Sequence, residues 1–192
     1  MAELDFRDAT EYDAEAIAAL HRAAADGLTT RHGRGVWSGA AGPRSVLNAV
    51  RDSRVLCALE ADRIVGALTL GWRKPWAIDP SCFAPAGRPL YLTGMVVDPA
   101  CQRRGVGRAL LRLADDVARD MGADQLRLDA WDAEAGAGGF YARCGWEEVG
   151  RRVYRGNPIL YFQRRLRDGA EATPPASSPS PGNGSAPAPS LS

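Results

Sequence analysis

The sequence predicts a single domain with helices packed on a mixed β-sheet, an α/β (α+β mixed sheet) fold in the order β-αα-βββ-α-β-α-ββ. Three observations predict this class. Short apolar runs typical of strands are separated by glycine, proline and aspartate. Apolar residues at positions 106, 109, 110, 113 and 117 repeat with the period of an amphipathic helix. A chain of 192 residues, of which 45% are hydrophobic and 24% charged, has room for one core of ordinary size.

Each element follows from its local pattern. Alternating or continuous apolar runs predict seven strands, over residues 4–7, 55–59, 64–72, 90–97, 125–130, 147–154 and 159–166. Helical periodicity, together with capping and stop residues, predicts four helices. The first begins after Thr10 and is broken at Gly27 and at Gly33–Gly35, and the others lie over 44–50, from 106 to a stop at Gly122, and over 134–144.

The C-terminal segment differs in composition from the rest of the chain. From Asp168 onward it is rich in proline, serine, alanine and glycine, and it contains no aromatic residue. Such a segment cannot bury enough apolar surface to offset its chain entropy. We therefore predict a folded domain over residues 1–167 and a disordered Pro/Ser/Ala-rich tail over 168–192.

Charge and cysteine usage exclude several classes of protein. The net charge of +1 argues against binding to nucleic acid or to an acidic membrane. The first residues lack the apolar stretch of a secretory signal, and no window approaches the roughly 18 apolar residues of a membrane helix. The four cysteines are widely scattered and show no paired spacing for a metal. We therefore expect a cytoplasmic protein with reduced thiols, without a metal, and with no nucleic acid or membrane as partner.

The segment CQRRGVGRAL, residues 101–110, places three arginines and two glycines between a predicted strand and a predicted helix. A helix N-terminus offers free N–H groups and a partial positive charge, and arginine binds phosphate in bidentate fashion. One interpretation is that this segment binds a diphosphate. The other is that it forms a tight turn whose arginines are solvated. The segment lacks the Gly-Lys-Ser/Thr of a nucleotide-binding P-loop. It also has Leu110 where a dinucleotide fingerprint needs its third glycine.

Two stretches resemble a known family. LYLTGMVVDP at residues 90–99, followed by QRRGVGR at 102–108, is similar to the acetyl-CoA motif of the GNAT (GCN5-related N-acetyltransferase) superfamily. FYARCGW at residues 140–146 resembles that family's second landmark. The resemblance covers the whole predicted domain. It implies an acyltransferase with splayed central strands that transfers the acetyl group of acetyl-CoA, its co-substrate, to a primary amine of a small molecule, peptide or protein.

The resemblance also assigns roles to residues. The Met95 N–H would stabilise the developing oxyanion, and Tyr141 would act as general acid. Glu134 stands where many relatives have an asparagine that contacts the pantetheine arm. The residues implied to bind the coenzyme are Met95, Val96, Val97, Arg103, Arg104, Gly105, Val106, Gly107, Arg108, Glu134 and Tyr141.

Several questions stay open at this level. The base that accepts the amine's proton is Asp129, Asp132, Glu134 or bulk solvent. An alternative function is a non-catalytic acetyl-CoA-binding or sensing domain, because the strand over 90–97 lacks the carboxylate that some relatives use. Members of the family often form homodimers, which nothing in the sequence demonstrates. Aromatic residues in loops are candidates for an acceptor pocket, together with His32: Trp37, Trp72, Trp76 and Phe83.

Overall fold

The computed structural model describes residues 3–166, and its element order confirms the predicted β-αα-βββ-α-β-α-ββ arrangement. The predicted tail over 168–192 lies outside the described residues. The helices are α1 (Ala14–His32), α2 (Pro43–Asp52), α3 (Val106–Asp120) and α4 (Gly138–Arg143). Short 3-10 turns are η1 (Glu11–Asp13), η2 (Val36–Ser38), η3 (Pro80–Cys82) and η4 (Pro99–Cys101).

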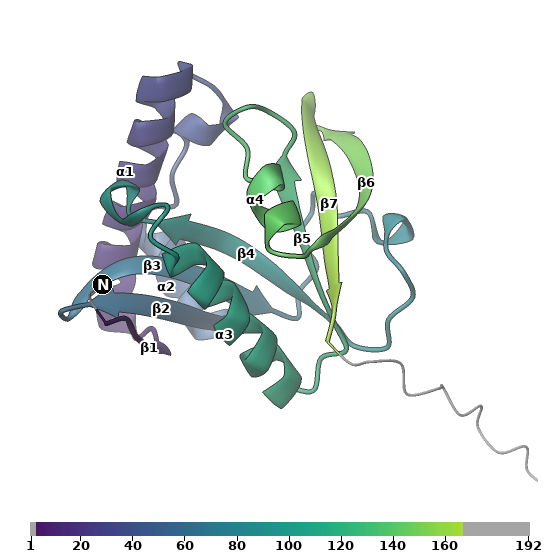
Figure 1. The fold of residues 1–192 in the computed structure, drawn as a ribbon, viewed down its shortest axis with the longest axis horizontal. Helices are drawn as coiled ribbons and strands as arrows, with labels where there is room; N and C mark the ends of the chain where they lie inside the picture. Colours follow the sequence, from purple (N-terminus) through teal and green to yellow (C-terminus); the bar gives the residue numbers. More distant parts are fainter. Residues whose placement is uncertain (1–2, 167–192) are drawn as a thin grey trace, which may run out of the picture.

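All seven strands form one mixed sheet in the order β1-β2-β3-β4-β5-β7-β6 (Figure 1). Their bounds are β1 (Asp5–Asp8), β2 (Arg54–Glu60), β3 (Arg63–Gly71), β4 (Pro89–Val97), β5 (Gln125–Trp131), β6 (Glu147–Tyr154) and β7 (Asn157–Arg165). The β4–β5 pair is parallel and the other neighbouring pairs are antiparallel.

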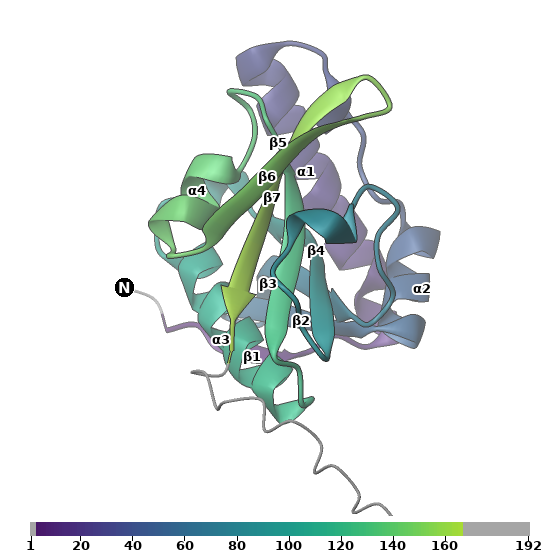
Figure 2. The ribbon, with the colours of Figure 1, turned by 90° about the vertical axis from the view of Figure 1, so that its right-hand side faces the viewer.

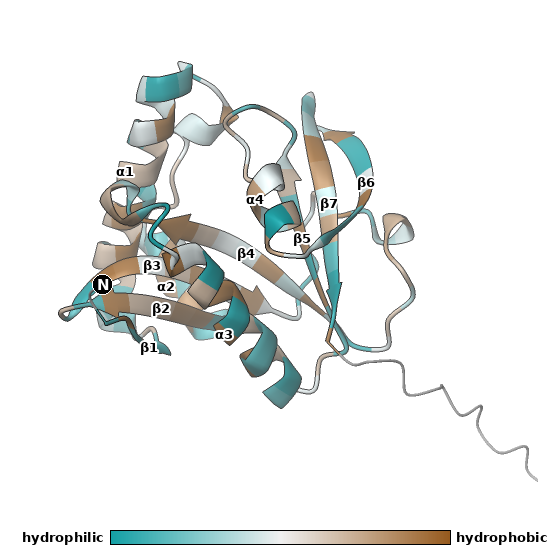
Figure 3. Ribbon diagram, in the orientation of Figure 1, coloured by the Kyte–Doolittle hydropathy of each residue, from teal (hydrophilic) through white to brown (hydrophobic). Residues whose placement is uncertain are grey.

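The helices form layers on both faces of the sheet. Figure 2 shows α1 and α2 on one side, and α3 and α4 on the other. Side chains of α1 and α2 pack with Val55, Cys57 and Ala67, whereas α3 packs with Leu68, Leu90 and other residues of the opposite face. The central strands consist largely of apolar residues, and the outer side of α3 is hydrophilic (Figure 3). This amphipathic division is the pattern that the sequence predicts for α3.

Two helix boundaries differ from the sequence prediction. Helix α1 continues through Gly27 and ends at His32, directly before the predicted break at Gly33. It contacts η4 near Gly27, where a Cβ would lie 3.6 Å from Pro99 Cγ, and such tertiary packing outweighs the low helix propensity of one glycine. Helix α4 begins only at Gly138, not at 134. A Cβ on Gly136 would lie 2.0 Å from the Trp131 carbonyl oxygen, so the chain before α4 turns tightly back on the end of β5.

Strands β4 and β5 separate after a short paired segment, as the resemblance implied. They pair at Pro89↔Gln125, Leu90↔Leu126 and Tyr91↔Arg127 only, although β4 continues to Val97. The edge of β4 that faces β5 is therefore without sheet partners beyond Tyr91.

A β-bulge lies in the separated part of β4. Thr93 pairs with Thr69 and Val96 pairs with Ala67, so β4 has one residue more than β3 between these positions. Gly94 takes a φ of 58° there, a left-handed conformation that favours glycine. The bulge turns the backbone immediately before Met95.

Candidate active site

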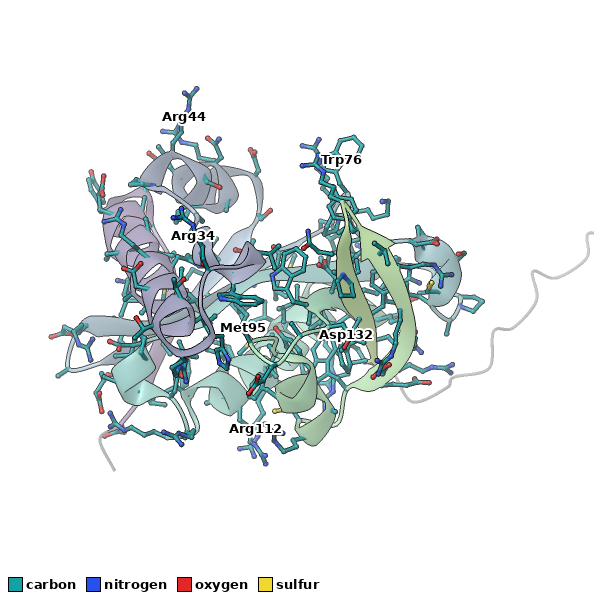
Figure 4. The ribbon with its side chains drawn as sticks, turned by 90° about the horizontal axis from the view of Figure 1, so that it is seen from above. Arg34, Arg44, Trp76, Met95, Arg112 and Asp132 are labelled. Atoms are coloured by element: carbon teal, nitrogen blue, oxygen red, sulfur yellow. The ribbon has the colours of Figure 1, made fainter. Side chains whose placement is uncertain are left out.

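A cavity of about 320 Å³ lies where β4 leaves β5, on the side of the sheet covered by α3 and α4. Five of the residues that the sequence implicates line it: Met95, Val97, Arg103, Gly107 and Tyr141. The other lining residues are Gln102, Ala137, Phe140 and Arg143. Figure 4 shows Met95 near the centre of the molecule, between the half that contains α1 and the half that contains β6 and β7.

The loop before α3 is shaped by its own backbone. The Asp98 carboxylate accepts a hydrogen bond of 2.8 Å from the Ala100 N–H and so caps η4. Arg103 and Gly105 take φ values of 61° and 92°. Gly105 is the N-cap of α3, and its carbonyl accepts from the Ala109 N–H at 3.0 Å. The three N–H groups before Ala109 belong to the first turn of α3, which leaves them without partners inside the helix.

The three arginines of this loop differ in what they contact. Arg103 lines the cavity, while the Arg104 guanidinium points away and pairs with Glu60 at the end of β2. This contact lowers the pKa of Glu60 below its ordinary value. Arg108 lines a neighbouring cavity. Arg103 is therefore the one of the three arginines that lines the larger cavity.

Tyr141 is the most buried polar group of this cavity. It lies on α4 with an exposed fraction of 6%, and its ring packs against those of Phe140, Trp146 and Phe162. The phenol donates to the Met95 Sδ at 3.6 Å. Burial raises the pKa of the Tyr141 phenol above its ordinary value. The hydroxyl therefore keeps its proton at neutral pH and is able to donate it.

A sequence model of the Acetyltransferase (GNAT) family matches residues 19–146, which is more than half of the chain. The chain belongs to the GNAT family. It is also 32% identical over 129 residues to the aminoglycoside N(6')-acetyltransferase type 1 of Stenotrophomonas maltophilia, a match that covers 65% of this chain and 82% of that protein. Family and relative together make this protein an acyltransferase.

Solved structures of GNAT proteins share the fold. The ribosomal-protein-S18-alanine N-acetyltransferase of Escherichia coli superposes with a TM-score of 0.67 at 15% identity, covering 88% of this chain and 98% of that one. The structure of yncA from Salmonella typhimurium, which contains its cofactor acetyl-CoA, gives a TM-score of 0.65 at 19% identity, with 88% and 96% covered.

The opposite face of the GNAT sheet holds a smaller cavity that the sequence analysis missed. It has a volume of about 150 Å³, and His21, Thr69, Thr93 and Gly94 contribute to its lining. Burial lowers the pKa of the His21 imidazole, so the ring is neutral at pH 7. The only sequence signal for this site is that His21 lies four residues after the buried Ile17 and hence on the apolar face of α1.

The three candidate acids lie in different environments. Asp129 lies on β5 beyond its last contact with β4, and burial raises the pKa of its carboxyl group. Asp132 forms an ion pair of 3.0 Å with Arg151. Glu134 is exposed in the turn before α4 and is not among the residues that line the cavity. Asp129 is thus the acid that is both free of an ion pair and partly withdrawn from water.

The loop aromatics do not gather in one pocket. Trp76 and Trp72 are 82% and 44% exposed, and Phe83 is buried in a separate cluster with Tyr161. Trp37 packs edge-on against His32 at 6.4 Å between ring centroids. The expected aromatic acceptor pocket is therefore absent from residues 3–166.

Within residues 3–166, no three His, Cys, Asp or Glu side chains are grouped so that they would hold a metal ion. No helix in that range combines the length and the apolar character that crossing a membrane requires.

Proposed function

We propose that this protein transfers the acetyl group of acetyl-CoA directly to a primary amine of a small molecule, a peptide or a protein. The observation that carries the proposal is the separation of β4 from β5 beyond Tyr91, with a cavity lined by Met95 and Tyr141 at that position. The aminoglycoside acetyltransferase relative supports an amine as acceptor. Acetyl-CoA as co-substrate is supported by the related fold that contains it.

The loop and the first turn of α3 have the chemistry to hold the coenzyme's diphosphate. The N–H groups of Val106, Gly107 and Arg108 are free for phosphate oxygens, and Gly105 and Gly107 place no side chain in the way. Arg103, which lines the cavity, adds a positive charge. Arg104 would contribute through its backbone, because its side chain is held by Glu60.

The unpaired edge of β4 would bind the pantetheine arm. Main-chain groups of Met95 and Val97 lie where β5 has already separated, so they can form sheet-like hydrogen bonds with the arm's amides. The main-chain groups of Val96 face β3, because successive residues of a strand direct these groups to opposite edges and the Asp98 N–H donates to the Val65 carbonyl of β3. The Gln102 side chain supports this edge by donating to the Val97 carbonyl at 3.3 Å. Glu134, which is exposed in the turn before α4, stays a proposed contact of the pantetheine arm.

The chemistry then follows from the groups around the cavity. The amine nitrogen attacks the thioester carbonyl, the C–N bond forms, and the C–S bond breaks. The Met95 N–H stabilises the negative charge that develops on the carbonyl oxygen. The Tyr141 hydroxyl gives its proton to the departing thiolate. The amine nitrogen loses a proton to a base. Among the three candidate acids, Asp129 is the best placed to be that base.

Turnover with an amine panel tests this function. Release of the CoA thiol should be detected with at least one small-molecule or peptide amine. Mass spectrometry should find a product about 42 Da heavier than that amine, which is the mass that one acetyl group adds. The competing function is a non-catalytic acetyl-CoA sensor, which the lack of an acidic residue on β4 favours. Tight acetyl-CoA binding without thiol release across the whole panel would support the sensor and refute the transferase.

The extent of the active unit belongs to the same proposal. Residues 1–167 are proposed to form the catalytic domain, acting in the cytoplasm as a monomer or a homodimer. A chain truncated after residue 167 should keep the turnover of the full chain, and sedimentation of both forms would give the oligomeric state. Loss of activity on truncation would place a functional element in the last 25 residues.

A further inference from the structure

The cavity that His21 lines, here called the His21 cavity, lies next to a residue of the proposed reaction. Its walls come from α1, α2, β3 and β4, and its volume is about 150 Å³. Thr93 and Gly94 of β4 belong to these walls, and Met95 follows directly in the chain. Figure 2 shows α1 and α2 together on this side of the sheet. The cavity therefore adjoins the proposed oxyanion donor from the face opposite to α3.

Gly94 leaves one side of the His21 cavity open. A Cβ on Gly94 would lie 3.6 Å from Thr69 Oγ1 and 4.0 Å from the Cε1 and Nε2 atoms of His21, so it would project between two residues of the wall. Gly94 is exposed, and its φ of 58° favours glycine. The backbone just before Met95 is thus bare, and a group on the acceptor can reach the cavity over it.

Asp129, the best placed of the candidate bases, points to the same face of the sheet. Tyr91 belongs to the buried cluster of Phe83, and the guanidinium of its partner Arg127 lies 4.8 Å from the Phe83 ring centroid. Side chains alternate along a strand, so Thr93 and Asp129, each two residues further along, share this direction. An amine that gives its proton to Asp129 would therefore lie beside the His21 cavity.

Within residues 3–166, no side chain that is ionised at pH 7 lines the His21 cavity. Three hydroxyls contribute to its wall, and burial lowers the pKa of His21, whose imidazole is neutral. A charged group would lose its hydration there without gaining a counter-ion, which is costly. The rest of the wall is apolar and consists of Ile17, Ala41, Val46, Ala49, Val55 and Ala67.

We propose that the His21 cavity binds a compact uncharged side group of the acceptor, and that the preferred acceptors are primary amines whose amine-bearing carbon carries a short apolar branch. An apolar cavity of about 150 Å³ holds benzene, so the branch has at most about six heavy atoms. This inference rests on the proposed function, because it places the amine at the thioester beside Met95. It adds a substrate class, from which amines with a second positive charge on this branch are excluded.

A panel of amino-acid amides tests this class, because its members differ in the side group alone. Glycinamide has none, leucinamide carries an isobutyl group, and argininamide carries a chain that ends in a guanidinium. At saturating acetyl-CoA, kcat/KM from thiol release should be at least about tenfold higher for leucinamide than for either of the others, since burial of an aliphatic side chain contributes that much. Equal kcat/KM values for leucinamide and argininamide would overturn the inference.

A substitution on α2 links this preference to the His21 cavity. Ala49→Leu narrows the cavity, so the ratio of kcat/KM between leucinamide and glycinamide should fall close to one. Ala19→Leu is the matched control, because Ala19 is exposed on α1, lines none of the cavities described above and should keep the ratio. Circular-dichroism melting shows whether each variant folds. If Ala49→Leu does not fold, Ser45→Leu narrows the cavity from an exposed position of the same helix.

A binding measurement separates the inference from the function beneath it. The chain contains two histidines, so proton NMR resolves their imidazole resonances, and His32→Gln assigns them. Leucinamide added to the chain with CoA should shift the His21 resonance and leave that of His32 in place.

The outcomes then differ for the two proposals. Thiol release without a preference for leucinamide, or without a shift of the His21 resonance, overturns the inference and leaves the acetyl transfer intact. A shift of the His21 resonance without thiol release from any amide supports the cavity as a site for apolar groups and counts against the transfer. The absence of both thiol release and a shift refutes both.

Discussion

Replacement of Gly107 by valine tests the larger cavity directly. Gly107 lines this cavity as the second residue of α3, and a Cβ there would lie 3.1 Å from Phe140 Cζ and 3.3 Å from Met95 Cε. Valine adds two further methyl groups in the same direction. Overpacking of a fitted site costs about 1–3 kcal/mol. Each 1.4 kcal/mol corresponds to a tenfold change in affinity. We therefore expect the Kd for acetyl-CoA to rise about 5- to 150-fold.

The effect on folding should be small by comparison. The two contacting atoms are ends of side chains that need to move by a few tenths of an ångström. Valine is also a slightly better helix former than glycine. The free energy of unfolding from urea titration should therefore change by no more than about 1 kcal/mol.

Calorimetric titration of acetyl-CoA into the variant gives the Kd, and Gly39→Val supplies the control. Gly39 is exposed at a φ of −85°, and a Cβ there meets nothing closer than the Val36 carbonyl oxygen at 4.0 Å. This control should bind acetyl-CoA like the wild type. An unchanged Kd in Gly107→Val would show that the coenzyme does not pass over Gly107 and would refute the assignment of this cavity.

Three other substitutions test separate parts of the argument. Tyr141→Phe should lower kcat by about 10²-fold or more while the Kd for acetyl-CoA changes little, and an unchanged rate would exclude the phenol as the acid. Leu110→Ala removes a fully buried side chain from the core and should cost about 2–5 kcal/mol in urea unfolding, whereas a cost below that range would contradict its place in the core. Arg7 holds the pKa of Asp13 well below its usual range, so this pair stabilises the fold above about pH 4 and loses its contribution as the pH falls. Asp13→Asn should therefore flatten the fall in stability between pH 5 and pH 2 seen by circular dichroism, and an unchanged slope would argue against the pair.

Much of the fold was predictable because its signals are local. The apolar stripe of α3, the glycine-rich junction before it and the alternation in the strands each lie within a few residues. Element order and family followed from these patterns, and the separation of β4 from β5 came with the family resemblance. The same reasoning broke α1 at Gly27 because of the low helix propensity of glycine, and it extended α4 back to residue 134 in spite of the glycines there.

The sequence by itself determined the order of elements, and its motifs gave the loop that is proposed to hold the coenzyme and Tyr141 as the candidate acid. Only the tertiary structure decided which charged side chains have an ion-pair partner and which have none. Arg104 is tied to Glu60, 44 residues away, while Arg112 and Arg143 meet from different helices around one cavity. The physical reason is that an ion pair or a cavity depends on strand register and helix packing, which join residues far apart in the chain and leave no periodic trace in it.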